Sequence, residues 1–66
     1  MTPESVARAV EYVRSLAGDP ELAHGAEDSV HMAVLLAIVD GEIEDPQECA
    51  RIALTTRDLD FPRWMA

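Results

Sequence analysis

Residues 19–41, with the sequence DPELAHGAEDSVHMAVLLAIVDG, decide the fold of this chain of 66 residues. Asp19 can cap a helix that begins at Pro20, because its carboxylate accepts a backbone N–H and proline has no N–H to leave unpaired. Gly41 can end that helix, because glycine adopts the left-handed conformation at little cost. The pattern therefore predicts a helix over 20–40, which Gly25 either weakens or divides into two.

The second half of this predicted helix is apolar on two opposite faces. One face carries Val30, Ala33, Val34, Ala37 and Ile38. The opposite face, here called the outer face, carries Met32, Leu35, Leu36 and Val39. A helix that is apolar all round must be covered all round, and two neighbouring helices can cover one side of it. We expect the outer face to bind a second copy of the chain or to receive the C-terminal segment.

The same cap chemistry recurs on both sides of the central helix. Thr2-Pro3 and Asp45-Pro46 predict helix starts, and Glu48 lies where a capping box with Asp45 requires it. We expect a first helix over 3–17, ended by Gly18 in the left-handed conformation, and a third helix over 46–56.

Each flanking helix has one apolar stripe at helical spacing. The stripe of the first helix consists of Val6, Ala9, Val10, Val13, Leu16 and Ala17. The stripe of the third helix consists of Cys49, Ile52 and Ala53, with Leu54 to one side. These stripes predict an all-α fold, a small three-helix bundle, in one domain over 1–66.

The C-terminal segment is too apolar for a loose end, because it contains Phe61, Trp64 and Met65. We expect it to pack back on the bundle. Trp64 either closes the core or forms, with Arg63, an anchor for a protein partner, since Trp and Arg are enriched at the centres of interfaces.

The net charge of the chain limits the classes of partner that it can bind. Thirteen acidic residues against five basic ones give a net charge of -8. This charge opposes contact with DNA or anionic membranes, and without a basic patch direct binding of nucleic acid is disfavoured. The longest apolar run, 32–39, has eight residues, far fewer than the roughly 20 that span a bilayer. The N-terminus has no signal-peptide pattern, so we expect a cytoplasmic protein without a membrane partner.

The densest charge forms an acidic patch on and after the end of the central helix. It consists of Asp40, Glu42, Glu44, Asp45 and Glu48. One interpretation is a surface for a basic partner, or an imitation of a row of phosphates. The other is a solvated loop followed by a helix start, where carboxylates are favoured by the helix dipole.

Few residues of this chain are candidates for metal binding or catalysis. His24, Asp28 and His31 share a face if the central helix is continuous, but the two histidines then lie about 10 Å apart along the axis. We assign no metal ligand to them and expect no cofactor. Cys49 lies on an inner stripe and is expected to be a small buried hydrophobe. We predict no catalytic residue and no enzyme.

Two segments carry a resemblance to a known group of proteins. Residues 40–46 (DGEIEDP) followed by 60–66 (DFPRWMA) resemble the end of small acidic helical proteins of actinobacteria and their phages. The resemblance covers the second half of the chain. It implies a cytoplasmic or phage-encoded origin and a helical fold, and it brings no activity, cofactor or site residue.

The functional prediction is a non-enzymatic protein-interaction module or small regulator, of cellular or phage origin, that forms a homodimer or binds another protein. Its predicted partner-binding residues are Met32, Leu35, Leu36, Val39, Phe61, Arg63 and Trp64. The first alternative is an acidic decoy that imitates DNA and inhibits a nucleic-acid-binding protein through the acidic patch. The second is a metal-dependent binder or enzyme that uses His24, Asp28 and His31.

Overall fold

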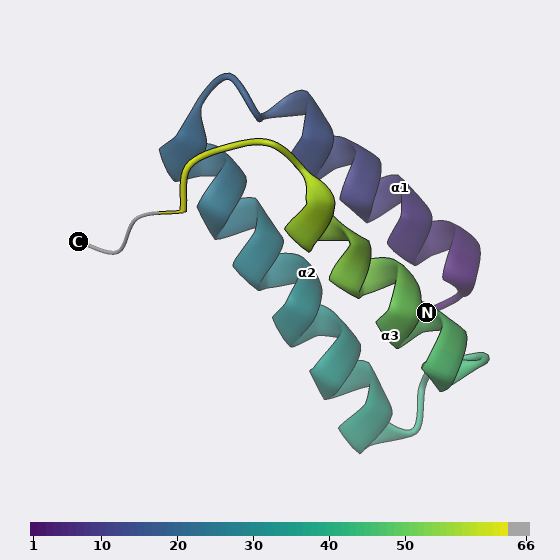
Figure 1. Cartoon of the computed structure of the whole chain (residues 1–66). Coiled ribbons are helices and arrows are strands. Elements are labelled where there is room, and N and C mark those ends of the chain that lie inside the picture. The colour runs from purple at the N-terminus through teal and green to yellow at the C-terminus, as the bar shows by residue number, and fades with distance from the viewer. Residues whose placement is uncertain (64–66) are drawn as a thin grey trace.

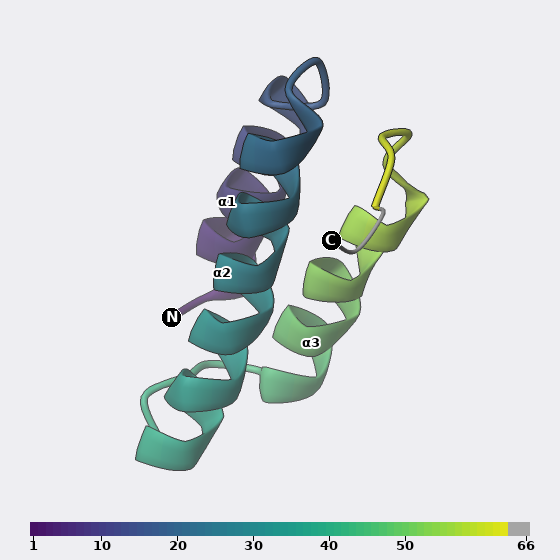
Figure 2. The same cartoon turned by 90° about the vertical axis from the view of Figure 1, so that its left-hand side faces the viewer.

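The chain folds into three helices in a computed structural model that describes residues 1–63 (Figure 1). The helices are α1 (Pro3–Ser15), α2 (Pro20–Asp40) and α3 (Pro46–Leu54), and a 3₁₀ turn over Thr55–Asp58 follows α3. They run alternately up, down and up, so that α2 is antiparallel to both neighbours (Figures 1 and 2). The predicted all-α three-helix bundle is confirmed, and α2 is continuous through Gly25.

All three helix starts have the predicted caps. The side chains of Thr2, Asp19 and Asp45 each accept a hydrogen bond from the backbone three residues later. The capping box, however, is at Thr2 and Ser5 rather than at Asp45 and Glu48. Glu48 is drawn away by Arg51, whose Nε and Nη2 donate to its carboxylate over 2.6 and 2.7 Å. Asp45 also has a positive φ of 48°, a conformation that Asp tolerates better than most residues.

The helix ends agree with prediction at one glycine and not at the other. Gly41 ends α2 with φ of 69° in the left-handed region. The prediction for Gly18 was wrong, because α1 ends earlier, at Ser15, and the residue that caps it is Leu16, with a φ of -96°. Gly41 is the only glycine of 1–63 with a positive φ. The chain leaves α1 through backbone bonds such as Asp19 N–H to the carbonyl of Leu16, over 2.8 Å, which need no left-handed residue.

The core lies where the three stripes meet. Its buried residues are Val6, Val10, Val13, Ala23, Val30, Val34, Cys49, Ala53, Leu59 and Phe61. The last two come from the segment after the 3₁₀ turn, which arches back toward the first half of α2 (Figure 1). The C-terminal segment therefore packs back on the bundle, as predicted, as far as residue 63.

The central helix extends beyond its neighbours. In both ribbon views the C-terminal end of α2 projects past the ends of α1 and α3 (Figures 1 and 2). Among the described residues α2 is also the one helix that is long and apolar enough to cross a membrane, with a mean hydropathy of 1.3. A core helix of a water-soluble bundle passes the same test, and α2 carries the buried residues Ala23, Glu27, Val30 and Val34.

Candidate functional site: an apolar face and groove on α2

The outer face of α2 is exposed. Met32, Leu35, Leu36 and Val39 are 56, 59, 53 and 80% exposed. Large apolar side chains at neighbouring positions of one helix form a surface that marks an interaction site more often than isolated ones do. On the opposite face the prediction was too wide, because Ala33 is exposed and Ile38 is 43% exposed. Val30 and Val34 are buried, Ala37 is half-buried, and Ala33 and Ile38 turn toward solvent.

An open groove runs between α1 and α2. It has a volume of about 650 Å³, and its lining residues are Ala9, Tyr12, Leu16, Glu21, Leu22, Gly25, Ala26, Ser29, Val30 and Ala33. Tyr12 and Leu22 on its lining are 61 and 56% exposed. The Ser29 hydroxyl donates to the carbonyl of Gly25 over 3.0 Å, so it is turned back on its own helix. The lining is therefore mainly apolar.

The sequence pattern did not predict this groove. Gly25 was a possible break in the helix, whereas the structure places it on an unbroken helix beside the groove. The signal was present in the spacing of Gly25, Ser29 and Ala33, which puts small side chains on one face at intervals of one turn. A depression beside that face could be recognised only after α1 was placed.

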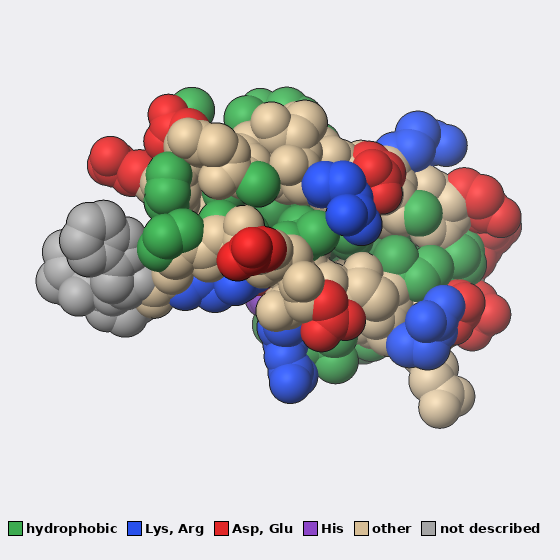
Figure 3. Space-filling view, turned by 45° about the horizontal axis from the view of Figure 1, so that its top comes forward, with side chains coloured by type: hydrophobic (Ala, Val, Ile, Leu, Met, Phe, Trp, Pro, Cys, Tyr) green, Lys and Arg blue, Asp and Glu red, His purple; other side chains and the backbone are tan. Residues whose placement is uncertain are grey.

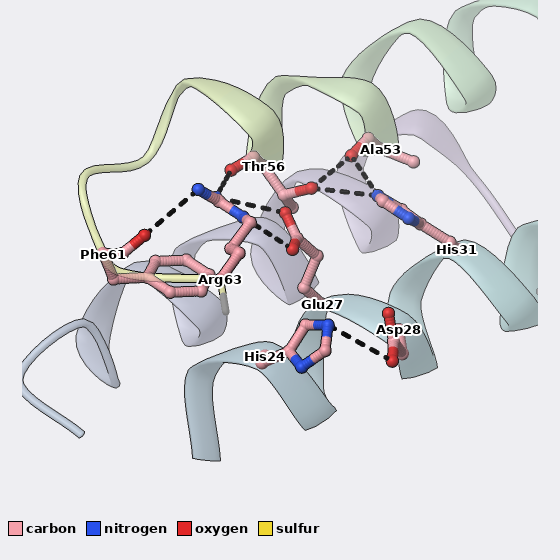
Figure 4. A network of polar contacts seen from close by, with 8 residues as sticks. All are labelled: His24, Glu27, Asp28, His31, Ala53, Thr56, Phe61 and Arg63. Atoms are coloured by element: carbon pink, nitrogen blue, oxygen red, sulfur yellow. Dashed lines mark hydrogen bonds and ion pairs between the residues drawn. The ribbon is translucent and has the colours of Figure 1, made fainter. Parts of the chain in front are cut away.

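A polar network holds the C-terminal segment against α2 (Figure 4). Glu27 is buried, and its two carboxylate oxygens accept from Nε and Nη2 of Arg63 over 2.8 and 3.2 Å. Arg63 also donates from Nη2 to the carbonyl of Thr56 over 2.6 Å. Its guanidinium lies over the ring of Phe61, 3.9 Å from the centroid. A bidentate ion pair of this kind fixes the relative orientation of the two side chains and also pairs their charges.

His31 extends the network to the end of α3 (Figure 4). Its Nε2 lies 2.9 Å from the hydroxyl of Thr56 and 3.2 Å from the carbonyl of Ala53. The Thr56 hydroxyl donates to the same carbonyl over 3.1 Å, so it accepts from His31, whose Nε2 carries the proton. Every buried side-chain nitrogen and oxygen within 1–63 has a partner. The network is closed and leaves no buried group free for a ligand.

The charge of Glu27 is stabilised by its surroundings. Burial by itself would raise the pKa of Glu27, but the hydrogen bonds from Arg63 and the positive charge of its guanidinium outweigh it. The pKa of Glu27 therefore lies below its usual value. The carboxylate is ionised at neutral pH and serves as a fixed anchor, not as a proton donor.

Two predicted partner-binding residues have a structural role instead. Phe61 is buried in the core, and Arg63 is held by Glu27, Thr56 and Phe61. The prediction that Phe61 faces a partner is thus corrected, because its side chain is needed to close the bundle. Trp64 and Met65 lie outside the described residues.

The three residues considered for a metal do not meet. His24 lies 3.7 Å from Asp28, one turn away on the same helix. His31 points instead to Thr56 and Ala53 (Figure 4). Within residues 1–63 no group of three His, Cys, Asp or Glu side chains could hold a metal ion. The metal hypothesis therefore has no geometric basis in the described part of the chain.

The acidic patch divides into two kinds of residue. Asp45 caps α3, and Glu48 is paired with Arg51, whose hydrogen bond is the main cause of the lowered pKa of Glu48. Asp40, Glu42 and Glu44 are exposed, and no ion pair within residues 1–63 involves them. Acidic side chains are spread over the whole face seen in Figure 3, with apolar ones between them. Three free carboxylates remain for a basic partner.

Cys49 is buried, as predicted. Its thiol donates to the carbonyl of Glu44 over 3.2 Å. Burial, followed by the negative charge of Asp45, raises the pKa of the thiol. A thiol of raised pKa and no exposure is a poor nucleophile.

The chain was compared with protein-family models, curated proteins and solved structures, and nothing matches in any of the three comparisons. The resemblance of the second half to small acidic actinobacterial and phage proteins stays a prediction.

Proposed function

We propose that this chain is a non-catalytic protein-interaction module that binds a protein partner through the outer face of α2. The observation that carries the proposal is the exposure, by more than half, of four large apolar side chains at positions i, i+3, i+4 and i+7 of one helix: Met32, Leu35, Leu36 and Val39. This spacing is the one by which helices dock into apolar grooves.

The free energy that burial of this face alone can supply is small. Full burial of such a side chain is worth about 1.5–3 kcal/mol, and each of these is already partly covered, so docking gains about 1 kcal/mol per residue. Four residues then supply about 4 kcal/mol, which the cost of association largely offsets. A partner must therefore use neighbouring surface too, and the groove lined by Tyr12 and Leu22 adjoins the same helix.

The polar residues support a binding role over a catalytic one. The buried titratable group, Glu27, is held by Arg63 within a closed network. Cys49 is buried with a raised pKa. Neither offers a reactive group to a substrate.

The charges support a cytoplasmic location for such a module. A helix in lipid would have to carry Glu27, Asp28 and two histidines through the bilayer, at a cost of several kcal/mol. In the bundle Glu27 has its partner in Arg63, and Asp28 is exposed. We propose that α2 is the core helix of a water-soluble protein.

An acidic decoy is the second candidate. It is favoured by the net charge of -8 and by the exposed carboxylates of Asp40, Glu42 and Glu44. Binding through these groups falls steeply with salt, because their interactions are screened within about 10 Å at 0.1 M ionic strength. Docking of the outer face tolerates salt.

The test is a pull-down with the tagged chain from a nuclease-treated actinobacterial lysate that also contains an untagged copy of the chain. Three baits are compared: the natural sequence, Leu36→Asp, and Glu42→Gln with Glu44→Gln. Arg57→Gln, at an exposed residue of the 3₁₀ turn, is the matched control. Circular dichroism verifies that each bait is folded.

We expect a protein that stays bound at 0.5 M salt, is lost with Leu36→Asp and is retained by the other variants. A partner lost with the Glu42 and Glu44 changes and at high salt would replace this proposal with the decoy. Equal capture by all baits would contradict both. Trp64→Ala tests the predicted contribution of Trp64 in the same assay.

A further inference from the structure

The two long sides of α2 each carry a seam of residues at alternating steps of three and four. The buried seam consists of Ala23, Glu27, Val30 and Val34. The opposite seam, here called the exposed seam, consists of Leu22, Gly25, Ser29, Met32, Leu36 and Val39, all exposed. Alternation of three and four is the spacing by which two helices pack along their length. The exposed seam thus has the pattern of a helix–helix interface without a helix on it within residues 1–63.

Side-chain size changes along the exposed seam. After Leu22 the seam continues with the small residues Gly25 and Ser29, which lie beside the groove. The seam ends with the large residues Met32, Leu36 and Val39 in the second half of α2. A helix that packs antiparallel on this seam fits best if it places large side chains opposite Gly25 and Ser29. A second copy of α2 in antiparallel orientation presents its own side chains in this reversed order.

We propose that the exposed seam binds α2 of a second copy of this chain in antiparallel register. Gly25 then lies opposite Leu36 of the second copy, Ser29 opposite its Met32, and Leu22 opposite its Val39. Every small residue faces a large one, and the twofold axis passes between positions 30 and 31. The contact is isologous, as in most homodimers. This inference rests on the proposed function and names a partner for the part of the outer face, Met32, Leu36 and Val39, that belongs to the exposed seam.

Gly25 provides an independent reason for a second copy. A Cβ built at Gly25 meets nothing within 4 Å among residues 1–63 of its own chain, and the φ of Gly25 is not positive. The isolated fold has no steric or backbone need for glycine here, although glycine in the middle of a helix costs stability relative to alanine. The close approach of Leu36 of a second copy gives a steric reason for glycine at this position.

The size of the molecule fits this arrangement. The 21 residues of α2 span about 30 Å, nearly the longest extent of the molecule, 33 Å, so a contact along α2 runs over almost the whole length of the chain. Antiparallel helices also oppose their dipoles favourably. The two chains carry -8 each, so repulsion weakens the dimer at low salt and added salt strengthens it.

Sedimentation equilibrium with exchanged side-chain sizes tests the contact. The chain has a mass of 7.2 kDa, and we expect a dimer of about twice that mass, with a dissociation constant that falls as NaCl is raised. A Cβ at Gly25 meets nothing among residues 1–63 of the free chain, but the side chain of Gly25→Leu collides with Leu36 of the second copy, so this change weakens the dimer by about a hundredfold or more. The double variant Gly25→Leu with Leu36→Ala should restore the affinity of the dimer. Arg57→Gln is the control and should leave that affinity unchanged.

Disulfide trapping tests the register. In a Cys49→Ala background, a mixture of Leu22→Cys and Val39→Cys chains should form the mixed disulfide, whereas Leu22→Cys alone should not. In a parallel dimer Leu22→Cys would link to itself, which would overturn the proposal. A natural chain that is monomeric at 0.5 mM in 0.5 M NaCl would overturn it as well.

The outcomes also separate this inference from the proposed function. A monomeric chain whose outer face captures another protein, with loss in Leu36→Asp, overturns the homodimer and leaves the interaction module standing. A dimer that Gly25→Leu does not weaken overturns the antiparallel seam.

Discussion

Glu27 is the residue that joins the C-terminal segment to the bundle. It lies on the buried seam of α2, and its partner Arg63 is 36 positions later in the chain. The sequence did not reveal this pair, because Glu27 stands next to Asp28 and His24 and resembles part of an exposed polar rim. A contact across this separation depends on how α3 and the 3₁₀ turn return the chain to α2. No local pattern encodes that path.

Loss of the Glu27–Arg63 pair should destabilise the fold. Arg63→Met leaves a buried carboxylate without its main partner, and since Arg63 is partly exposed we expect a loss of about 2 kcal/mol in the free energy of unfolding. Urea unfolding followed by circular dichroism measures it. Arg8→Met, at an exposed position of α1, is the matched control and should change stability little. An equal effect of both variants would contradict the structural role of the pair.

The same pair predicts a pH dependence of stability. The folded pKa of Glu27 is lowered, so its contribution is complete above the unfolded value of about 4.3 and is lost as pH falls through the folded value. The melting temperature of the natural chain should therefore exceed that of Glu27→Gln at pH 7. The difference should shrink as pH is lowered toward 3. A difference that stays constant with pH would show that ionisation of Glu27 is not its cause.

The helices follow from short sequence signals, and their exceptions have local causes. Three caps before proline and the left-handed Gly41 were predicted correctly, because each depends on residues within one turn. Gly18 was misplaced, because the final turn of α1 loosens before the glycine is reached. Glu48 did not close a capping box, since Arg51 competes for its carboxylate.

The two glycines provide a matched test of helix termination. A Cβ at Gly18 or Gly41 meets nothing within 4 Å in the part of the chain that the structure describes, but Gly41 alone of the two has a positive φ. Gly41→Ala should therefore cost about 1 kcal/mol of stability, the strain of a left-handed L-residue. Gly18→Ala should be neutral or slightly stabilising. Thermal unfolding of the two variants checks this, and a loss of stability in Gly18→Ala alone would contradict the assignment.

At the scale of the whole molecule, the sequence predicted which faces are apolar but not which of them stay uncovered. The outer face was expected to meet a second copy or the C-terminal segment. As far as residue 63 that segment contacts Glu27 and Thr56 instead, and Met32, Leu36 and Val39 remain exposed. The groove became recognisable only with α1 in place. The exposure of the outer face and the position of the groove depend on which parts of α2 are covered by α1, α3 and the C-terminal segment. The periodicity of apolar residues along α2 does not determine which parts are covered.

The central claim is that the exposed side of α2 is covered by a second copy of the chain. The most direct measurement is the melting temperature of the natural chain and of Leu36→Asp over a hundredfold range of concentration in 0.5 M NaCl. We expect the natural chain to melt roughly 3–6 °C higher for each tenfold rise where the dimer predominates. Leu36→Asp should melt at one temperature throughout, because Leu36 is 53% exposed in the single chain. A melting temperature of the natural chain that does not change with concentration would contradict the claim.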